Sequence, residues 1–531
     1  AWLLGELYGA ARGPADVLAV LHGRRAPDSL SGHFLLLAHD ARADEWHAWT
    51  NRGATFHAYY ATDGRRAALG TCFRAVADAA ARPDLDWEAL TSFCAFGFCA
   101  ADRTFLADVR LLRPASHYRF DGRGRLLGAE RTWQWQHAPE AGRSYAATID
   151  AFAERFQAVM DDVLAEGRVA LPISGGLDSR STVAAVRGED AADGRLWAYS
   201  YGYSADSVET RLARRVARAR RLNFDAFTIR PYLFARLPRV LASIEGFQEV
   251  TQARQASAIE AIGVRSDSVI AAHIGDVWLG DMGTSAGAAH SPDDLVAQAA
   301  HKFHKGGSAW LLQHVCRPRL GRTEPENMLH DLLAAELARL PAFEDADFTV
   351  KALKIEQWCA RWTTASLRMF QSAAFPRLPF YDTRLFDFFS TVPTRYVSGR
   401  RLQIDYLRRY APDLARVPWQ ETGRSLFAGE GFDARHLGRR VVRKARAVLS
   451  RKRVLERNWE VQFLGQAGRA GLHEWLLRPG RRLHEVVDPA AVRELLAAFE
   501  RDPWAEKRGY TVSTLLTLSA WLDYMAGDLD R

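Results

Sequence analysis

Cysteine is scarce in this sequence, and no two cysteines form a C-x-x-C pair. The five are Cys72, Cys94, Cys99, Cys316 and Cys359. Neither a disulfide framework nor a cysteine-bound zinc ion is therefore expected. Long apolar runs are lacking too, since none approaches the roughly 18 residues that a membrane-spanning helix needs. No signal peptide is recognised ahead of the first expected strand, so we expect a cytoplasmic protein without membrane contact.

Neither sign of charge dominates, because 71 lysines and arginines face 63 acidic residues and leave a net charge of +8. With 48% hydrophobic and 25% charged residues among 531, the composition is that of a globular protein of two or three domains. Residues 439–457 concentrate the positive charge. They are either a solvated helix face or a patch for an acidic partner. No nucleic-acid motif accompanies them, so no nucleic-acid partner is expected.

One short run indicates a phosphate-binding loop. An apolar strand at 169–173 leads into Ser174, Gly175, Gly176, Leu177, Asp178 and Ser179, and a helix-forming segment at 181–186 follows. The glycines let backbone N–H groups point inward, and the helix start adds positive potential, so a phosphate is the natural occupant. An acid among anions makes sense if Asp178 holds a metal ion that bridges the phosphates. A Gly-Gly turn that only closes a strand is the alternative.

The same run is not a Walker loop, which requires G-x-x-x-x-G-K-[ST]. It resembles the SGGxDS pyrophosphate loop of ATP pyrophosphatases, and in detail the asparagine synthetase B family with its relatives, the β-lactam synthetases and lasso-peptide cyclases. The resemblance implies that residues 174–179 bind the β- and γ-phosphates of ATP while a substrate carboxylate attacks the α-phosphate. It also implies that Tyr199, Ser200 and Tyr201 line the adenine pocket; an aromatic strand of the core is the alternative.

A second acid lies in the stretch 273–280, which resembles the family's Gly-x-Gly-x-Asp-Glu-x-x-Gly segment. Asp276 and Gly280 match, whereas Val277 replaces the usual glutamate. The resemblance implies that Asp178 and Asp276 share one Mg²⁺ with the triphosphate, which is how nucleotide sites usually hold a hard cation. A helix cap is the alternative role for Asp276.

The first third of the chain reads as short strands separated by turns. Strands are expected at 2–8, 33–38, 46–50 and 58–60, with a hairpin turn at Asp63-Gly64. The phrases at 30–34, 51–53 and 111–115 resemble the glutaminase domain of asparagine synthetases. This resemblance implies a sandwich of two sheets between helices.

The nucleophile of that domain is an N-terminal cysteine, but Ala1 stands in its place here. A methyl group cannot attack an amide. The Asn-Gly-Glu run that normally binds glutamine is also absent after Tyr60. Either an engineered exchange replaced the cysteine or glutaminase activity was lost naturally, and the missing run favours loss.

Strands alternate with helices after a helical linker at 144–166. Strands are expected at 196–202, 224–229 and 268–272, which predicts a doubly wound parallel sheet with its ligand at the carboxyl ends of the strands. From Pro292 on the sequence is mainly helical. The predicted fold class is therefore α/β, with a glutaminase-like αββα sandwich at 1–140 and an asparagine-synthetase-like ATP-binding domain at 141–531.

Two arginines are the catalytic candidates. The stretch 375–382 resembles the family's Glu-x-Arg-x-Pro-Phe-Leu-Asp, so Arg377 is a candidate for binding the substrate or the AMP phosphate, with a buried structural salt bridge as the alternative. Phe375 stands where synthetases often place a glutamate, and a phenyl ring cannot be a general base. Glu421 lies near the place of the family's lysine, and Arg424 is the candidate to supply the missing charge.

These features predict an AMP-forming ligase that uses ATP and Mg²⁺. A substrate carboxylate would be adenylated with release of pyrophosphate, and an amine would then displace AMP. The departures from the family argue against asparagine synthesis and favour a cyclase or ligase of peptides or small molecules in biosynthesis, with a partner protein as a candidate to present the substrate. The alternative is a catalytically inactive ATP-binding scaffold or regulatory protein.

Overall fold

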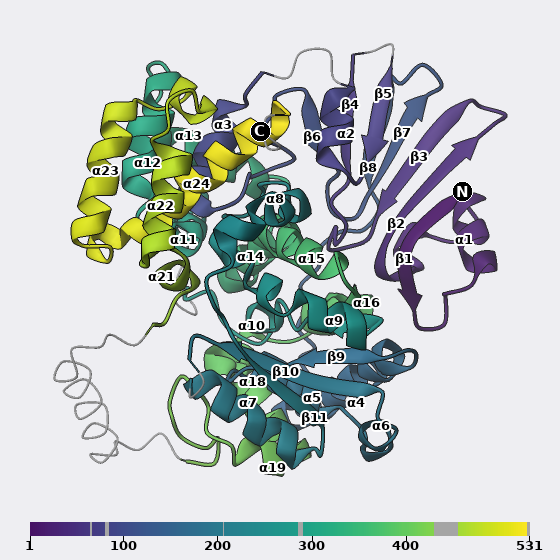
Figure 1. Ribbon diagram of the computed structural model, residues 1–531. Helices are drawn as coiled ribbons and strands as arrows, with labels where there is room; N and C mark the ends of the chain where they lie inside the picture. The colour runs from purple at the N-terminus through teal and green to yellow at the C-terminus, as the bar shows by residue number, and fades with distance from the viewer. Residues whose placement is uncertain (64–65, 80–83, 205–206, 285–289, 429–454, 528–531) are drawn as a thin grey trace.

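The computed structural model describes residues 1–63, 66–79, 84–204, 207–284, 290–428 and 455–527 (Figure 1). The basic segment at 439–457 lies outside the described residues as far as position 454, and so does Gly64 of the expected hairpin turn. Figure 1 shows antiparallel sheets near the amino terminus, a parallel sheet formed by the middle of the chain, and a group of helices near the carboxyl terminus.

Two antiparallel sheets form the amino-terminal region, with strand orders β1-β2-β3-β7-β8 and β5-β4-β6. Their strands are β1 (Trp2–Tyr8), β2 (Ser31–Asp40), β3 (Glu45–Thr50), β4 (Tyr59–Thr62), β5 (Ala67–Gly70), β6 (Val109–Leu111), β7 (Ser116–Asp121) and β8 (Leu126–Arg131), accompanied by helices α1 (Pro14–Leu21) and α2 (Phe73–Asp78). Along β7, every second side chain is buried, because alternate residues of a strand face opposite sides. Tyr118 and Phe120 of β7 pack with Leu35 of β2 and with Tyr60 of the second sheet. The expected sandwich of two sheets is confirmed.

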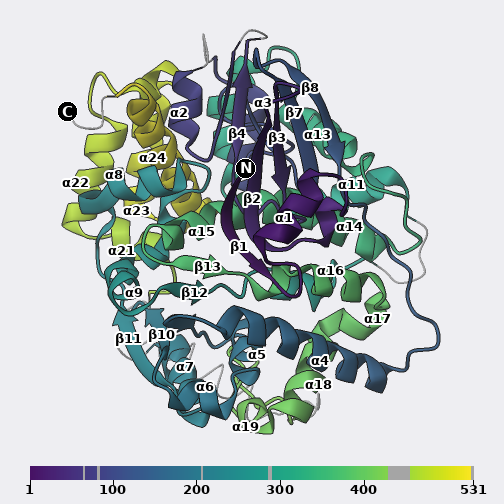
Figure 2. The same ribbon diagram turned by 90° about the vertical axis from the view of Figure 1, so that its right-hand side faces the viewer.

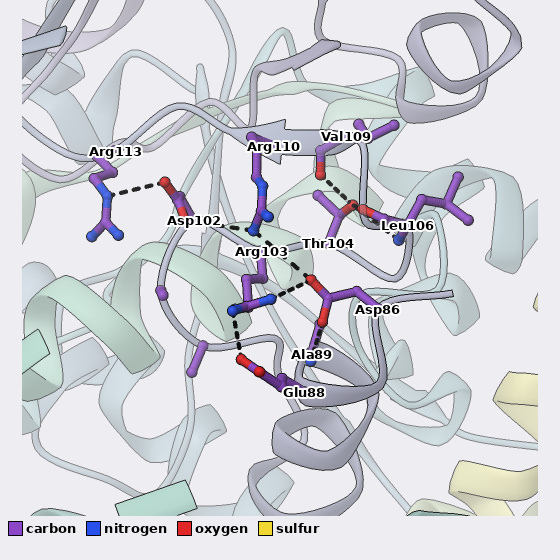
Figure 3. Close-up of polar contacts among 12 residues, drawn as sticks. Asp86, Glu88, Ala89, Asp102, Arg103, Thr104, Leu106, Val109, Arg110 and Arg113 are labelled. Atoms are coloured by element: carbon purple, nitrogen blue, oxygen red, sulfur yellow. Dashed lines mark hydrogen bonds and ion pairs between the residues drawn. The ribbon is translucent and has the colours of Figure 1, made fainter. Parts of the chain in front are cut away.

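Helix α3 (Trp87–Phe96) leaves the sheets and packs against α12 (Ser308–Leu311) and α13 (Pro325–Leu337). Asp86 caps this helix by accepting a hydrogen bond from the N–H of Ala89 at 3.0 Å. The same carboxylate forms an ion pair with Arg103 at 2.7 Å, and Arg103 forms a second ion pair with Glu88 at 2.5 Å (Figure 3). Ion pairs therefore hold the loop that returns from α3 to strand β6.

The parallel sheet has the strand order β11-β10-β9-β12-β13. Its strands are β9 (Val169–Pro172), β10 (Leu196–Gly202), β11 (Asn223–Thr228), β12 (Ser268–Ile270) and β13 (Phe375–Arg377), and its nearby helices are α4 (Tyr145–Leu164), α5 (Asp178–Ala184), α6 (Gly188–Ala192), α7 (Val208–Ala219), α8 (Leu233–Ile244) and α9 (Ile259–Arg265). The chain runs outward from β9 to β11 and then returns to the other side of β9. Strand order therefore reverses between β9 and β12, which is where doubly wound sheets bind ligands. The expected doubly wound sheet is confirmed, and β13 is an additional edge strand.

The rest of the described chain is mainly helical, as expected. The helices are α10 (Gly275–Trp278), α11 (Pro292–Phe303), α12 (Ser308–Leu311), α13 (Pro325–Leu337), α14 (Ala346–Lys354), α15 (Thr364–Gln371), α16 (Thr383–Ser390), α17 (Thr394–Val397), α18 (Arg401–Tyr410), α19 (Pro412–Ala415), α21 (Asn458–Phe463), α22 (Gln466–Leu476), α23 (Pro489–Arg501) and α24 (Arg508–Met525). Helix α24 is buried along most of its length. Within the described ranges, no helix has the length and apolar character needed to cross a membrane.

Arginine–carboxylate pairs join the antiparallel sheets to the helical part of the chain. Arg113 donates two hydrogen bonds to the buried Glu336, at 2.7 and 2.9 Å, and Arg131 pairs with the buried Glu356. One cluster of buried hydrophobic side chains also extends across both parts. Figure 2 shows the antiparallel sheets above the parallel sheet, with α15 and α16 between them. The two halves of the chain therefore share a core.

Candidate functional site

The loop after β9 is a compact turn held by its own serines. The hydroxyls of Ser174 and Ser179 lie 3.0 Å apart, and the hydroxyl of Ser179 also accepts from the N–H of Ser174 at 3.0 Å. Gly176 donates its N–H to the hydroxyl of Ser174 at 3.2 Å. Both hydroxyls therefore lie on one side of the turn, where phosphate oxygens can replace the hydrogen bond between them.

Arg180 fastens a distant segment onto this loop. Its fully buried guanidinium donates to the carbonyl oxygens of Val417 at 2.7 Å, Pro418 at 2.9 Å and Gly175 at 3.3 Å. The N–H of Gln420 donates to the same carbonyl of Gly175 at 3.1 Å. A Cβ at Gly175 would collide with the side chain of Gln420. Only glycine fits at this contact.

Asp178, the half-buried first residue of α5, pairs with Arg400. Arg400 and Gln403 both donate to Oδ1 of Asp178, and the distance from Gln403 is 3.1 Å. Gln403 also accepts from Nε of Arg400 at 2.8 Å and donates to the hydroxyl of Ser181 at 3.0 Å. A small hydrogen-bonded network therefore surrounds the acid of the loop.

Arg400 reaches Asp178 from a strained turn. Gly399 and Arg400 have φ values of +61° and +64°, and this left-handed conformation is unfavourable for arginine. Asp281 holds the turn by accepting from the N–H of Gly399 at 2.9 Å. Because Asp281 lies five residues after Asp276, the segment that carries the second acid also fixes Arg400.

The loop after β12 brings Asp276 to the phosphate loop. A Cβ added at Gly275 would lie 2.9 Å from Cγ of Asp178, so the two loops touch where glycine leaves room. Burial raises the pKa of Asp178 to about 6; the charge of Arg400 opposes this increase, and the charge of Asp276 adds to it. The structure therefore brings the two predicted metal-binding acids close enough to interact electrostatically.

These residues fit a magnesium ion only together with a nucleotide. Mg²⁺ in nucleotide sites takes one or two carboxylates, phosphate oxygens and water, and two carboxylates beside two hydroxyls suit that requirement. Among the residues that the structure describes, no group of three or more His, Cys, Asp or Glu side chains could hold a metal ion by itself. Metal binding is therefore expected to depend on a bound phosphate group.

Strand β10 places the three predicted adenine-pocket residues in different surroundings. Tyr199 is buried and stacks on Trp197 with ring centroids 5.1 Å apart, and its hydroxyl finds no hydrogen-bond partner among the described residues. Ser200 is buried on the opposite side of the strand. The ring of Tyr201 lies beneath the guanidinium of Arg254, at 5.9 Å. Tyr199 is therefore buried in the core of this structure, and contact of all three residues with adenine stays a prediction.

Arg377 lies on β13 and forms an ion pair with Glu6 of β1. Its guanidinium donates to the two carboxylate oxygens of Glu6 at 2.8 and 3.1 Å, and to the carbonyls of Val163 and Glu166 at 2.9 and 2.8 Å. These carbonyls precede β9, whereas the phosphate loop follows it. The structure does not bring this guanidinium to the phosphate loop, and its contacts match the structural alternative.

Phe375, at the position of the family's glutamate, is part of an aromatic contact between β13 and β2. Its ring lies 5.1 Å from that of His33 and 6.3 Å from that of Phe56. Burial lowers the pKa of His33 to about 3, so this imidazole is neutral at pH 7. A Cβ at Gly5 would collide with the carbonyl oxygen of His33, which explains the glycine there.

The segment that carries Arg424 closes as a tight turn beside the phosphate loop. Trp419 donates to the carbonyl of Arg424 at 2.8 Å, and Gly423 donates to that of Trp419 at 2.7 Å. Gln420 contacts the phosphate loop, whereas Glu421 is exposed. Arg424 is half-buried at the end of the turn, and its catalytic role stays a prediction.

Arg180, Arg400 and Gln403 are site residues that were not predicted from the sequence. Two of them have a local feature that could have drawn attention to them. Arg180 directly follows the SGGLDS run, and Arg400 stands between a glycine and a second arginine. No spacing in the sequence identifies their distant partners, because the contacts of Arg180 with Val417 and of Arg400 and Gln403 with Asp178 each join residues more than 200 positions apart.

A parallel sheet with a serine–glycine loop and two acids at its strand reversal defines a nucleotide-binding α/β protein. Residues 152–259 match the model of the asparagine synthase family, a span that includes α4 from Phe152 on, the phosphate loop and strands β9 to β11. A comparison with curated proteins gives no match. The family match supports an asparagine synthetase-like protein, and with it an ATP-dependent ligase that forms amide bonds.

Proposed function

We propose that this protein adenylates a substrate carboxylate with ATP, releases pyrophosphate and lets an amine displace AMP. The observation that carries this proposal is the contact between the two acid-bearing loops at the strand reversal, where Gly275 meets Asp178. Ser174, Gly176 and Ser179 supply donors for the phosphates there. The ligand of a doubly wound sheet is expected at this place.

Asp178 and Asp276 are the residues that would hold Mg²⁺, which supplies charge neutralisation on the phosphates when bound. Arg400 is a cation within hydrogen-bonding distance of Asp178. When a nucleotide binds beside Asp178, we expect the side chain of Arg400 to rotate from the carboxylate to a phosphate oxygen. It can therefore supply the positive charge that Glu421, near the place of the family's lysine, cannot. Preorganised cations of this kind stabilise charge that develops during phosphoryl and acyl transfer.

The amine is proposed to come from the substrate itself or from a second small molecule, and not from glutamine. Two observations support this: the Asn-Gly-Glu run is absent after Tyr60, and Phe375 offers no base at the place of the family's glutamate. A cyclase or ligase of peptides or small molecules in biosynthesis fits these departures. A partner protein that presents the substrate is part of this proposal.

Thermal unfolding with and without Mg-ATP is the first test. Ligand at about 100 times its dissociation constant should stabilise the protein by roughly 2.7 kcal/mol. The wild type should shift, whereas Asp178→Asn and Asp276→Asn should not. Asp161→Asn is the matched control, because Asp161 pairs with Arg187 on the surface. If the unfolding temperature of the wild type does not shift, the protein has no ATP site and the proposal is wrong. If it does shift, assays of pyrophosphate release with carboxylates and peptides are the next step.

A nucleotide-binding protein without catalysis is the second candidate. The observation that favours it is the ion pair of Asp178 with Arg400, which neutralises the acid expected to bind a metal ion. Incubation with Mg-ATP and pools of carboxylates and amines separates the two candidates. AMP and pyrophosphate accumulate in equal amounts if the protein is a ligase, whereas a scaffold binds ATP and returns it intact.

A further inference from the structure

A cavity of about 390 Å³ lies where the carboxy-terminal helices meet the end of β10. Its walls come from Tyr203, which follows β10, and from the segments 249–254, 305–306, 456–459 and 507–510. The last three of these segments lie outside the part of the chain that matches the family model. The size of the cavity suits a small-molecule ligand.

Four cations from four separate segments line this cavity: Arg254, Lys305, Arg457 and Lys507. Among the described residues, none of the four has a carboxylate within the 4.0 Å that defines an ion pair. Many other arginines in the protein are paired, as Arg113 is with Glu336. Glu209 and the hydroxyl of Tyr203 act on Arg254 from nearby. Four like charges without an ion pair in one cavity still repel each other, so an anionic ligand would lower the free energy of this arrangement.

Two acids also line the cavity, and neither pairs with these cations. Glu249 is buried, and its carboxylate accepts from the N–H of Thr251 at 3.1 Å and from its hydroxyl at 2.5 Å. Glu456 is exposed, and its own N–H donates to Glu460. Burial lowers the pKa of Lys305, and only the charge of Glu249 opposes this effect. The cavity therefore keeps an excess of positive charge.

The backbone around the cavity is shaped to hold Lys507. Glu506 and Lys507 have consecutive φ values of +51° and +54°, an unfavourable conformation for both residues. A Cβ at Gly306 would collide with the side chain of Lys507, and one at Gly509 would collide with the ring of Trp459. Lys507 is also the residue before α24, whose first N–H groups add positive potential. Strain of this kind is common at binding sites.

We propose that this cavity binds a small, multiply charged anion whose charges are carried by carboxylate or phosphate oxygens. The site shares no residue with the nucleotide loop 174–179, although Arg254 lies over the ring of Tyr201, a predicted adenine-pocket residue, and both sites lie at the carboxyl ends of neighbouring strands. Arg254 and Arg457 offer planar donors for bidentate contacts, and Lys305 and Lys507 offer point charges.

Thermal unfolding with citrate and with pyrophosphate, in the absence of Mg²⁺, tests the site. We expect at least one of the two anions to raise the unfolding temperature beyond sodium chloride of equal ionic strength. In a Lys305→Gln/Lys507→Gln variant the apparent dissociation constant should rise by roughly a hundredfold or more, since two charge-assisted hydrogen bonds are lost and each contributes about tenfold or more in affinity. A response to citrate alone would identify a polycarboxylate ligand, and a response to pyrophosphate alone a phosphate ligand.

Two controls make the result decisive. Lys302→Gln/Arg501→Gln removes the same charge from exposed positions outside the cavity and should bind as the wild type does. Ser174→Ala/Ser179→Ala removes donors from the nucleotide loop and should leave the anion effect intact. The double lysine variant should unfold at the same or a higher temperature without ligand, because it relieves repulsion. No anion effect in the wild type, an unchanged effect in the double lysine variant, or an effect lost with the serines would overturn the proposal.

Discussion

Arg400 and Asp178 form an ion pair between the starts of α18 and α5, although 222 positions separate them in the chain. A helix start favours an acid and disfavours a cation, so Asp178 suits its position and Arg400 does not. Arg400 also has an unfavourable φ of +64°. The arginine is therefore held in place by its partner and by the turn that Asp281 fixes, and not by its own backbone preference.

Replacement of Arg400 should impair catalysis far more than replacement of its neighbour. A charge-assisted hydrogen bond contributes about 1.5–3 kcal/mol, so Arg400→Gln should lower kcat/KM for ATP by roughly 10- to 100-fold. Arg401→Gln is the matched control, because Arg401 lies over the ring of Tyr145 at 4.1 Å and makes no contact with Asp178. Steady-state pyrophosphate release measures both. Equal activity of the two variants would contradict a role for Arg400.

The raised pKa of Asp178 makes stability depend on pH in a defined direction. Its pKa is 3.8 in the unfolded chain and about 6 in the folded protein, so the folded protein binds this proton more tightly. The carboxyl group therefore stabilises the fold fully below pH 4 and loses this contribution as the pH rises to about 6. Urea unfolding of the wild type and of Asp178→Asn between these limits should show the difference.

Two further variants check the cause of this pH dependence. The charge of Arg400 lowers the pKa of Asp178, so Arg400→Gln should move the loss of stability to higher pH. The charge of Asp276 raises that pKa, and Asp276→Asn should move the loss to lower pH. Shifts in the same direction for both variants would show that the two charges do not act on Asp178.

The contact between the two acid-bearing loops leaves no room for a side chain at Gly275, so we predict that alanine is not tolerated there. Its Cβ would lie 2.9 Å from Cγ of Asp178 and 3.0 Å from the ring of Phe380, so the two loops must separate. We expect Gly275→Ala to abolish the stabilisation by Mg-ATP. Gly188→Ala is the control, since no atom lies within 4 Å of the Cβ that it adds. Wild-type affinity for ATP in Gly275→Ala, by calorimetry, would contradict the arrangement.

Arg377 should prove to be a structural residue. Arg377→Met removes the cation beside Glu6, which keeps the hydroxyl of Tyr8 as a donor at 3.2 Å, and it removes a donor from two carbonyl groups; together these losses should cost about 1–3 kcal/mol of unfolding free energy. Glu6→Gln should also destabilise the protein, because the same ion pair is lost. Neither variant should change KM for ATP at a temperature where it stays folded. A fall in kcat without a loss of stability would restore the catalytic role.

The sequence predicted the elements whose signal is local. The apolar run before Ser174 and the alternation of strands and helices after it were sufficient for β9, β10 and the doubly wound sheet, since each depends on residues within one segment. Strand β13 escaped prediction because it has three residues and includes Pro376, and proline is confined to edge strands and their ends. Its place in the sheet follows from tertiary pairing with β12.

Some residues of the candidate site could be predicted from local sequence, and others depend on tertiary contacts. Asp178 and Asp276 follow strands, so their meeting at the sheet edge could be inferred from the sequence. Arg400 could not, because its approach depends on a left-handed turn and on a contact with Asp281 that the sequence does not reveal. The sequence leaves an adenine pocket and an aromatic core strand open for Tyr199, because its burial against Trp197 depends on tertiary packing.

The shared interface between the two halves affects how this protein can evolve. Glu336 and Glu356 are buried carboxylates whose cationic partners, Arg113 and Arg131, belong to the first 131 residues. Deletion of the antiparallel sheets would leave both charges without a counter-ion and would expose the apolar side chains that the halves share. Selection for a stable fold therefore acts to keep those sheets even where they carry no chemistry of their own.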